Sequence, residues 1–252
     1  MPAGKLLILA DVHANLAAFE AVLNAERAWD ELIFLGDIVV GGPEPEACVQ
    51  LLRKVDANVA LAGNHDRQAL EAQIDADDAN PDRQWIRWTQ AQLSRDSLAY
   101  LRAMRPSCTI DRAGATMRLH HGDFPATLGR FWPDWPAEKL DALIAMYAEP
   151  CIVAAHSHVQ FELEHAGARL INPGSVGQPR LGQPLALYMV IDDGVMDFRA
   201  VAYDVDRTCR AMDTMPLPGW FIDMWKGIYR DGMLSDRYPL RDWQPLIDAG
   251  YR

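Results

Sequence analysis

Cysteine is scarce in this chain, and its placement argues against a stapled fold. The four cysteines are far apart and form no C-x-x-C pair, so neither a zinc knot nor a redox motif is indicated. They stand at Cys48, Cys108, Cys151 and Cys209. We read them as reduced thiols and expect a cytoplasmic protein.

Long apolar runs are also missing. The apolar run before Asp11 covers only residues 6–10, which is shorter than the apolar core of a signal peptide. No later run approaches the roughly 20 residues that a membrane-spanning helix needs. We therefore expect neither a secretory signal nor contact with a membrane.

Positive charge is in deficit. Lysine and arginine number 24 against 35 aspartates and glutamates, which gives a formal charge of −11. Binding of a nucleic-acid duplex relies on lysine and arginine neutralising phosphates, so we expect no duplex partner. An anionic substrate would have to be attracted by local positive charge, such as bound metal.

Residues able to bind metal stand in five short clusters. Each cluster follows an apolar run that is typical of a strand buried on both faces, at 6–10, 32–35, 58–62, 116–120 and 152–155. Ligands just past the carboxyl ends of strands lie where α/β sheets place their sites. The clusters are Asp11-x-His13, Gly36-Asp37, Gly63-Asn64-His65-Asp66, His121-Gly122 and His156-x-His158.

This donor set points to two metal ions. Two aspartates, one asparagine and four histidines are too many ligands for one tetrahedral zinc, but they suit two divalent ions that share a carboxylate. Two ions roughly 3.5–4 Å apart can hold both the attacking hydroxide and the phosphoryl oxygens in an in-line displacement. Mixed imidazole, carboxylate and amide ligation favours manganese, iron, cobalt or zinc over magnesium or calcium.

The clusters, in this order, resemble those of the calcineurin-like metallophosphoesterases, whose pattern runs D-x-H, G-D, G-N-H-D/E, H and G-H-x-H. The match covers roughly the first three-quarters of the chain. The flanks of Asp11, the stretch from Gly36 to Pro43 and the segment 172–180 are similar to the small bacterial and archaeal branch described as phosphodiesterase or diadenosine-tetraphosphatase-like. The resemblance implies an α/β fold, α+β in some schemes, of two face-to-face mixed β-sheets flanked by helices.

The resemblance also implies a role for each site residue. It places Asp11, His13 and His158 on a first metal, and Asn64, His121 and His156 on a second, with Asp37 bridging them. The metals would be two divalent transition-metal ions, with manganese preferred. His65 would protonate the leaving group, and Asp66 would hold the ring of His65. The substrate would be a small phosphorylated molecule.

Two details depart from the family pattern or complicate it. Ala155 replaces the glycine of G-H-x-H, which we expect to be tolerated if the backbone there does not need a positive φ. His120 precedes His121, and adjacent strand residues point to opposite faces, so only one can be a ligand. The family's His-Gly pair selects His121, and His120 is expected to be packed or hydrogen-bonded.

Between the strands the pattern is helical. Asn15 is expected to cap one helix and Pro43 or Pro45 to start another. Strands are also predicted at 168–171, 186–191 and 195–201, the last two joined by a hairpin at 192–194. We predict a metallophosphoesterase domain over 1–203 with a small helical cap at about 67–115, in which Asn80-Pro81 starts the first of two helices.

Several residues outside the clusters are candidates for substrate contact. Arg180 could bind the distal phosphate of a substrate, although a salt bridge at a turn is equally compatible with the sequence. Trp85 and Trp88 of the cap could line the mouth of the site. The aromatics of segment 123–135 could stack on a nucleobase, but packing onto the core is the stronger interpretation.

The stretch 204–252 is rich in aromatics without clear periodicity. It is expected to pack on the core or on a partner subunit, which leaves a homo-oligomer open. Its rings include those of Trp220, Phe221, Trp225, Tyr229, Tyr238 and Trp243.

The sequence thus predicts a two-metal hydrolase of phosphoester bonds, a phosphodiesterase or phosphatase acting on nucleotides or dinucleoside polyphosphates among other candidates. The alternative is a catalytically weak metal-binding regulatory module that keeps the same fold. His65 favours the enzyme, because a binding module needs no acid for a leaving group.

Overall fold

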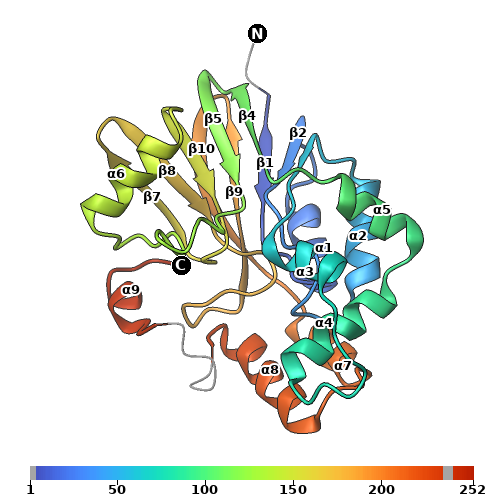
Figure 1. Cartoon of the computed structure of the whole chain (residues 1–252). Coiled ribbons are helices and arrows are strands. Elements are labelled where there is room, and N and C mark those ends of the chain that lie inside the picture. The colour runs from blue at the N-terminus through green and yellow to red at the C-terminus, as the bar shows by residue number, and fades with distance from the viewer. Residues whose placement is uncertain (1–3, 235–240) are drawn as a thin grey trace.

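The computed structural model describes residues 4–234 and 241–252, in which two mixed five-stranded β-sheets are flanked by helices (Figure 1). Apolar side chains from both sheets meet in one shared core, so the sheets lie face to face. This is the predicted architecture. Within the described ranges, no helix is long and apolar enough to cross a bilayer.

The first sheet has the strand order β10-β9-β1-β2-β3. Its three N-terminal strands run parallel, and β9 and β10 are antiparallel additions. The hairpin between these two was predicted, and Asp193 and Gly194 take the positive φ that a tight hairpin turn requires. The strands are β1 (Leu6–Leu9), β2 (Glu31–Phe34), β3 (Val59–Ala60), β9 (Leu185–Asp192) and β10 (Val195–Ala202).

The second sheet has the order β4-β5-β6-β8-β7, with three parallel strands in the centre and an antiparallel strand at each edge. The sequence did not predict β4 or β7, since charged and half-buried residues in both obscure the apolar pattern. The strands are β4 (Ser107–Arg112), β5 (Ala115–His120), β6 (Cys151–Ala154), β7 (Gln160–His165) and β8 (Ala168–Pro173).

Strand β1 is apolar along its whole length because both of its faces are buried. Leu6 and Ile8 point into the core between the sheets, whereas Leu7 and Leu9 point into the core under the helices. That outer core is formed with α1 (Leu16–Ala25) and α2 (Pro45–Lys54). Asn15 caps α1 as predicted, and Pro45 rather than Pro43 starts α2.

The segment 67–115 is only partly helical. It contains most of α3 (Asn64–Glu71), then α4 (Pro81–Gln92) and α5 (Arg95–Ala103), and Asn80 caps α4 as predicted. Residues 107–112 form β4, so the helical part ends earlier than the expected boundary near 115. In Figure 1 these helices lie beside and below the first sheet.

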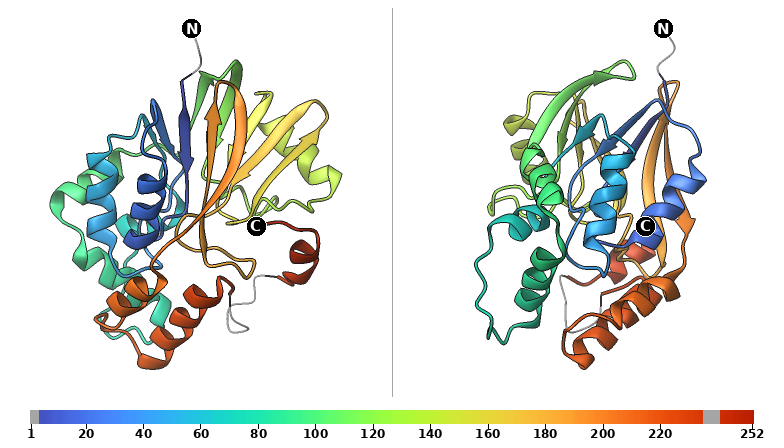
Figure 2. Two further views of the ribbon diagram at one scale, coloured as in Figure 1. Left: turned by 180° about the vertical axis from the view of Figure 1, so that it is seen from behind. Right: turned by 90° about the vertical axis from the view of Figure 1, so that its right-hand side faces the viewer.

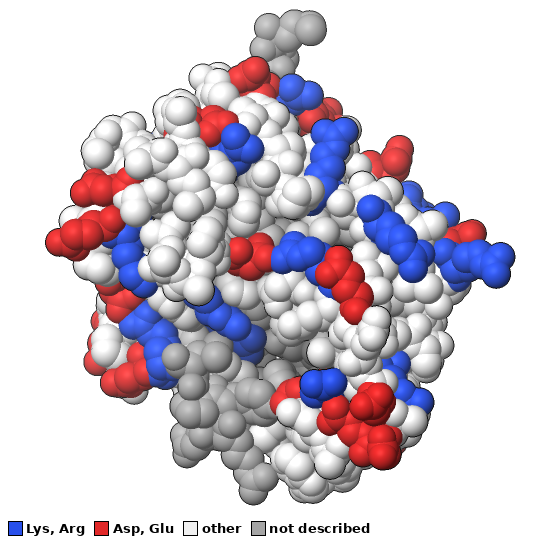
Figure 3. All heavy atoms as spheres, in the orientation of Figure 1, with Lys and Arg blue, Asp and Glu red and all other residues white. Residues whose placement is uncertain are grey.

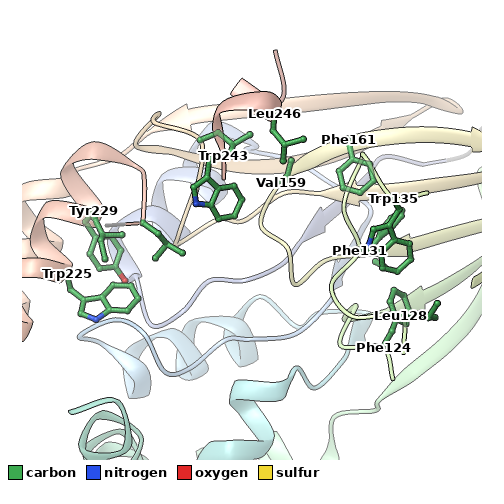
Figure 4. Packing of buried hydrophobic residues seen from close by; sticks show 14 of the residues in the cluster. Phe124, Leu128, Phe131, Trp135, Val159, Phe161, Trp225, Tyr229, Trp243 and Leu246 are labelled. Carbon is green, nitrogen blue, oxygen red and sulfur yellow. The ribbon is translucent and has the colours of Figure 1, made fainter. Parts of the chain in front are cut away.

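The outer face of the second sheet is covered by α6 (Ala137–Met146) and by the aromatic segment before it. Phe124, Phe131 and Trp135 are buried there in a column with Phe161 (Figure 4). These rings anchor the segment onto the core, as the stronger interpretation of the sequence held.

The C-terminal stretch contains α7 (Val205–Met212), α8 (Gly219–Asp231) and α9 (Gln244–Asp248). Helix α8 passes below the sheets beside α4 (Figures 1 and 2), where the rings of Trp225 and Trp85 meet edge to face at 5.1 Å. The ring of Trp243, just before α9, meets that of Trp132 at 5.5 Å. Tyr238 lies outside the described residues.

Candidate metal centre

The five predicted clusters converge at the carboxyl ends of β1, β2, β3, β5 and β6. Nitrogen or oxygen atoms of Asp11, His13 and His158 lie within 4.8 Å of one another, as do those of Asp37, His121 and His156. The amide oxygen of Asn64 is 3.2 Å from His121 Nε2. All seven predicted ligands therefore surround one small region, and His65 also comes within 4.8 Å of His13 and Asp37.

The two groups share the carboxylate of Asp37. Its Oδ2 is 3.1 Å from His121 Nε2 and 3.8 Å from His13 Nε2. In the first group, Asp11 Oδ1 is 3.4 Å from His158 Nε2, and the Nε2 atoms of His13 and His158 are 3.1 Å apart. Asp37 thus lies where a bridging ligand was predicted.

Backbone carbonyls orient three of the histidines. Nδ1 of His13 lies 2.8 Å from the Val40 carbonyl, and Nδ1 of His158 lies 2.6 Å from that of Gln178. Nδ1 of His121 lies 3.0 Å from the Leu35 carbonyl. Because each Nδ1–H donates outward, each Nε2 lone pair faces the centre, as a metal ligand requires.

The inward-facing atoms fit cations. Three Nε2 lone pairs and two carboxylates meet within about hydrogen-bond distance, and Asp11 Oδ1 accepts no hydrogen bond from the described residues. Burial disfavours charge on His121, but the carboxylates of Asp37 and Asp11 outweigh it and raise its pKa to about 10. Such a field favours positive charge at the centre.

Two other ligands are held in the protonation states that bind metal. Burial, with the positive charges of His121 and Arg130, lowers the pKa of His156 to about 2. Burial opposes the charge on Asp37, yet His121, His65 and His13 hold its pKa well below the ordinary value. A neutral imidazole and an ionised carboxylate are the forms that bind metal.

The backbone at the ligands is strained. Asp11, His13, Asp37, His156 and His158 have φ values of 53°, 49°, 59°, 68° and 67°, in the left-handed region. Each costs on the order of 1–3 kcal/mol unless the surroundings enforce it, and such strain gathers at functional sites. The left-handed turns re-aim each side chain directly after its strand.

Two glycines let neighbouring ligand loops approach. Gly36 has a φ of 107°, and a Cβ there would lie 2.5 Å from the backbone nitrogen of Gly63. A Cβ on Gly63 would overlap the carboxylate of Asp37. The glycines of the G-D and G-N-H clusters are therefore required by close contact.

Asp66 corrects one sequence prediction, because it does not hold the ring of His65. Its buried carboxylate accepts hydrogen bonds from the backbone N–H groups of Asp37 (2.8 Å), Ile38 (2.9 Å), Val39 (3.3 Å) and Gly63 (2.9 Å). Asp66 lies in the first turn of α3, where the free backbone N–H groups are within reach of its oxygens. These donors are more accessible to the carboxylate than the ring of His65 on the same turn. It therefore ties the Asp37 loop to the start of α3.

His65 lines the cavity in front of the ligands. Its Nδ1 has no hydrogen-bond partner in the described part of the chain, and its ring lies 5.1 Å from that of His13. Burial and the nearby His13 and His121 outweigh the attraction of Asp37 and lower its pKa to about 4. An anionic substrate beside the ring would act against that shift.

Two arginines face the same cavity. Arg180 is 6% exposed, and only its Nη2 donates, to Gln178 Oε1 at 3.1 Å. Among the described residues its Nε and Nη1 have no partner, and no described carboxylate forms the salt bridge at a turn that the sequence also allowed. Burial and Arg130 lower its pKa to about 9. Arg130, which the sequence analysis did not single out, lies beside it with Nη1 3.5 Å from the His156 carbonyl.

Comparison with known proteins identifies the family of this chain. Residues 5–194 match the sequence model of the calcineurin-like phosphoesterase superfamily domain. The chain belongs to this superfamily. As a member of a metal-dependent family of phosphoesterases, it is expected to bind metal through the residues gathered here.

Individual proteins similar to this calcineurin-like phosphoesterase cover nearly its whole length. It is 30% identical to a metallophosphoesterase of Sphaerobacter thermophilus, whose structure aligns over 92% of this chain and 100% of its own with a TM-score of 0.76. The hypothetical protein PH1004 of Pyrococcus horikoshii shares the fold at 18% identity, with a TM-score of 0.77 over 92% of this chain and 99% of its own. The uncharacterized protein MJ0912 of Methanocaldococcus jannaschii is 29% identical over 87% of this chain and 96% of its own length.

The structure of this phosphoesterase also explains Ala155 and His120, the two residues that depart from or complicate the family pattern. Ala155 is not among the residues with positive φ, so its methyl group is tolerated where the family has glycine. His120 accepts from the backbone N–H of Gly122 at 2.8 Å and stacks on Phe124 at 4.8 Å. It is a packed, hydrogen-bonded residue, and His121 is the one that faces the centre.

Proposed function

We propose that this protein is a hydrolase of phosphoester bonds that depends on two divalent metal ions. One observation carries the proposal: six of the seven candidate ligands form two adjacent groups. Asp37 of one group lies 3.8 Å from His13 of the other, and the seventh ligand, Asn64, lies 3.2 Å from His121. We assign Asp11, His13 and His158 to one ion, and Asn64, His121 and His156 to the other. Bound manganese, iron, zinc or cobalt would acidify water and screen the charge of a phosphoryl group.

The residues in front of the ligands supply the remaining chemistry. We assign to His65 the donation of a proton to the oxygen of the leaving alcohol, because it lines the cavity and its Nδ1 is not engaged by the described residues. A bound phosphate beside the ring would raise its lowered pKa. Positioned proton transfer of this kind contributes about 10²–10⁴-fold in rate.

Arg180 and Arg130 bind phosphate oxygens of the substrate. A buried guanidinium with two nitrogens that no described residue engages is costly unless an anion completes it, and a phosphate matches its geometry. The substrate is therefore a small phosphorylated molecule, held by its phosphate between the arginines and the candidate ligands.

The test separates metal binding from proton transfer. Protein loaded with manganese should contain close to two ions per chain, and His65→Ala should keep that content while losing rate. The loss should be largest for alkyl phosphoesters and smallest for aryl esters of acidic phenols, which need little protonation. A content that saturates at one ion would refute the two-metal site. Loss of metal in His65→Ala would make His65 a ligand instead.

A further inference from the structure

The cavity in front of the candidate ligands has two walls of different chemistry. It has a volume of about 330 Å³. One wall carries His13, Asp37, His65, His156, His158, Arg130 and Arg180. A second, apolar part of the lining is formed by Trp85 and Ile86 of α4, Trp225 of α8, and Leu234.

Packing between α4 and α8 holds the apolar wall together. Trp85 is 2% exposed, and its ring meets those of Trp225 at 5.1 Å and Phe221 at 5.6 Å, both edge to face. Its Nε1 donates to the carbonyl of Gly42 at 3.3 Å. Trp85 is therefore both a core residue and part of the cavity wall, and Trp88 does not line the cavity.

Helix α8 is also tied to the metal-ligand loops. One turn after Trp225, the hydroxyl of Tyr229 donates to the carbonyl of Gly41, which also accepts from Gln178 Nε2 at 2.7 Å. The backbone carbonyl of Gln178 is the one that orients His158. Figure 4 shows Trp225 and Tyr229 side by side on α8. The position of the wall is thus fixed relative to the ligands.

This helix lies outside residues 5–194, which match the superfamily domain. We propose that α8, together with α4, forms the pocket for the leaving group and restricts the enzyme to phosphoesters whose organic part is one compact apolar group, such as a single aromatic ring. This inference rests on the proposed phosphoester hydrolysis.

The size of the cavity supports this substrate class. A volume of about 330 Å³ is near the lower end of the roughly 300–1,000 Å³ range of ligand pockets, and a phosphoryl group takes part of it. A dinucleoside polyphosphate or a phosphoprotein loop exceeds the space that is left.

Charge on one face of the molecule is mixed. On the face shown in Figure 3, acidic and basic side chains are interspersed over most of the surface, and acidic side chains gather at the lower right. The proposed selection therefore rests on the cavity walls and not on the charge of this face.

The experiment compares kcat/KM for phosphate substrates of increasing size in the metal-loaded full-length protein. The substrates are 4-nitrophenyl phosphate, the two-ring 4-methylumbelliferyl phosphate and diadenosine tetraphosphate. The wild type should prefer the first. Trp225→Ala removes one ring from the cavity wall. It should raise kcat/KM for 4-methylumbelliferyl phosphate relative to 4-nitrophenyl phosphate by about tenfold, a typical effect of pocket size. Trp220→Ala, on the same helix but outside the cavity lining, is the matched control and should leave the ratio unchanged.

A second variant covers the case in which Trp225→Ala does not fold. Ile86→Trp narrows the pocket from α4 and should lower the same ratio. An unchanged ratio in both variants, with full metal content, would overturn the pocket assignment and leave the proposed hydrolysis intact. Failure of every metal-loaded form to cleave any ester would instead overturn the proposed function. Calorimetry would then decide the pocket: Trp225→Ala should weaken phenyl phosphate but not inorganic phosphate, and equal weakening would refute it.

Discussion

Replacing Asp66 by alanine should loosen the loop that carries Asp37 and lower the stability of the whole protein. The buried carboxylate accepts four backbone hydrogen bonds, and three of the donors belong to residues 37–39. The alanine variant leaves these buried N–H groups without an acceptor. The defect is therefore structural first and affects the metal centre through Asp37.

The magnitude follows from the number and kind of these bonds. Hydrogen bonds to a charged group contribute about 1.5–3 kcal/mol each, but they are not additive around one carboxylate. Breaking a buried charged network typically costs about 3–5 kcal/mol, and we expect this range for Asp66→Ala. In a chain of this size, 1 kcal/mol shifts the Tm by about 2–4 °C, so the Tm should fall by roughly 6–20 °C.

The assay is urea unfolding of the metal-free protein, followed by metal analysis after reloading. Asp96→Ala is the matched control, since Asp96 is an exposed acid in the first turn of α5 and should change stability by less than about 0.5 kcal/mol. A loss below about 1 kcal/mol in Asp66→Ala, with hydrolysis abolished and metal retained, would refute this reasoning. That result would restore Asp66 to the role of partner for His65.

Two other predictions follow from burial and close contact. Burial opposes the charge on Glu26, but hydrogen bonds from Lys5, Arg199 and Tyr188 outweigh it and lower its pKa from 4.5. A carboxyl group with a lowered pKa stabilises the fold at any pH above its unfolded pKa. This stability is lost as the pH falls through the folded pKa. Glu26→Gln should therefore cost about 1.5–3 kcal/mol at pH 7 in urea unfolding, and the difference should shrink below about pH 4.5; a constant difference would contradict the assignment. Gly63→Ala should place a methyl group against the Asp37 carboxylate and reduce metal content at saturating manganese, whereas full loading would show that the loop can move aside.

The clustering of the candidate ligands could be predicted from the sequence, but the contacts of the residues around them could not. The convergence of the candidate ligands could be predicted because each cluster follows an apolar strand, and strand ends meet at one edge of a sheet. The role of Asp66 could not, because one sequence does not tell whether a carboxylate faces an imidazole or a set of backbone N–H groups.

The missed elements share a physical reason. Strands β4 and β7 lie at the edges of the second sheet, where one face is solvated and charged residues interrupt the apolar pattern. Trp225 is separated from the last ligand cluster by more than sixty residues, so only the packing of α8 on α4 shows that it reaches the cavity. Arg130 similarly lies in an aromatic loop whose rings are packed elsewhere.

The pairing of β1 with β9 has a consequence for how the chain is made. Leu6 pairs with Ile191, so one edge of β1 finds its partner only after nearly the whole chain has left the ribosome. At about 5–20 residues per second, synthesis of the intervening segment takes roughly 10–40 s. During that time an apolar strand edge is open to pairing with other chains, a recognised route to aggregation. The second sheet, built entirely from residues 107–173, can form earlier. Nascent chains stalled before residue 185 should therefore be the species most dependent on chaperones.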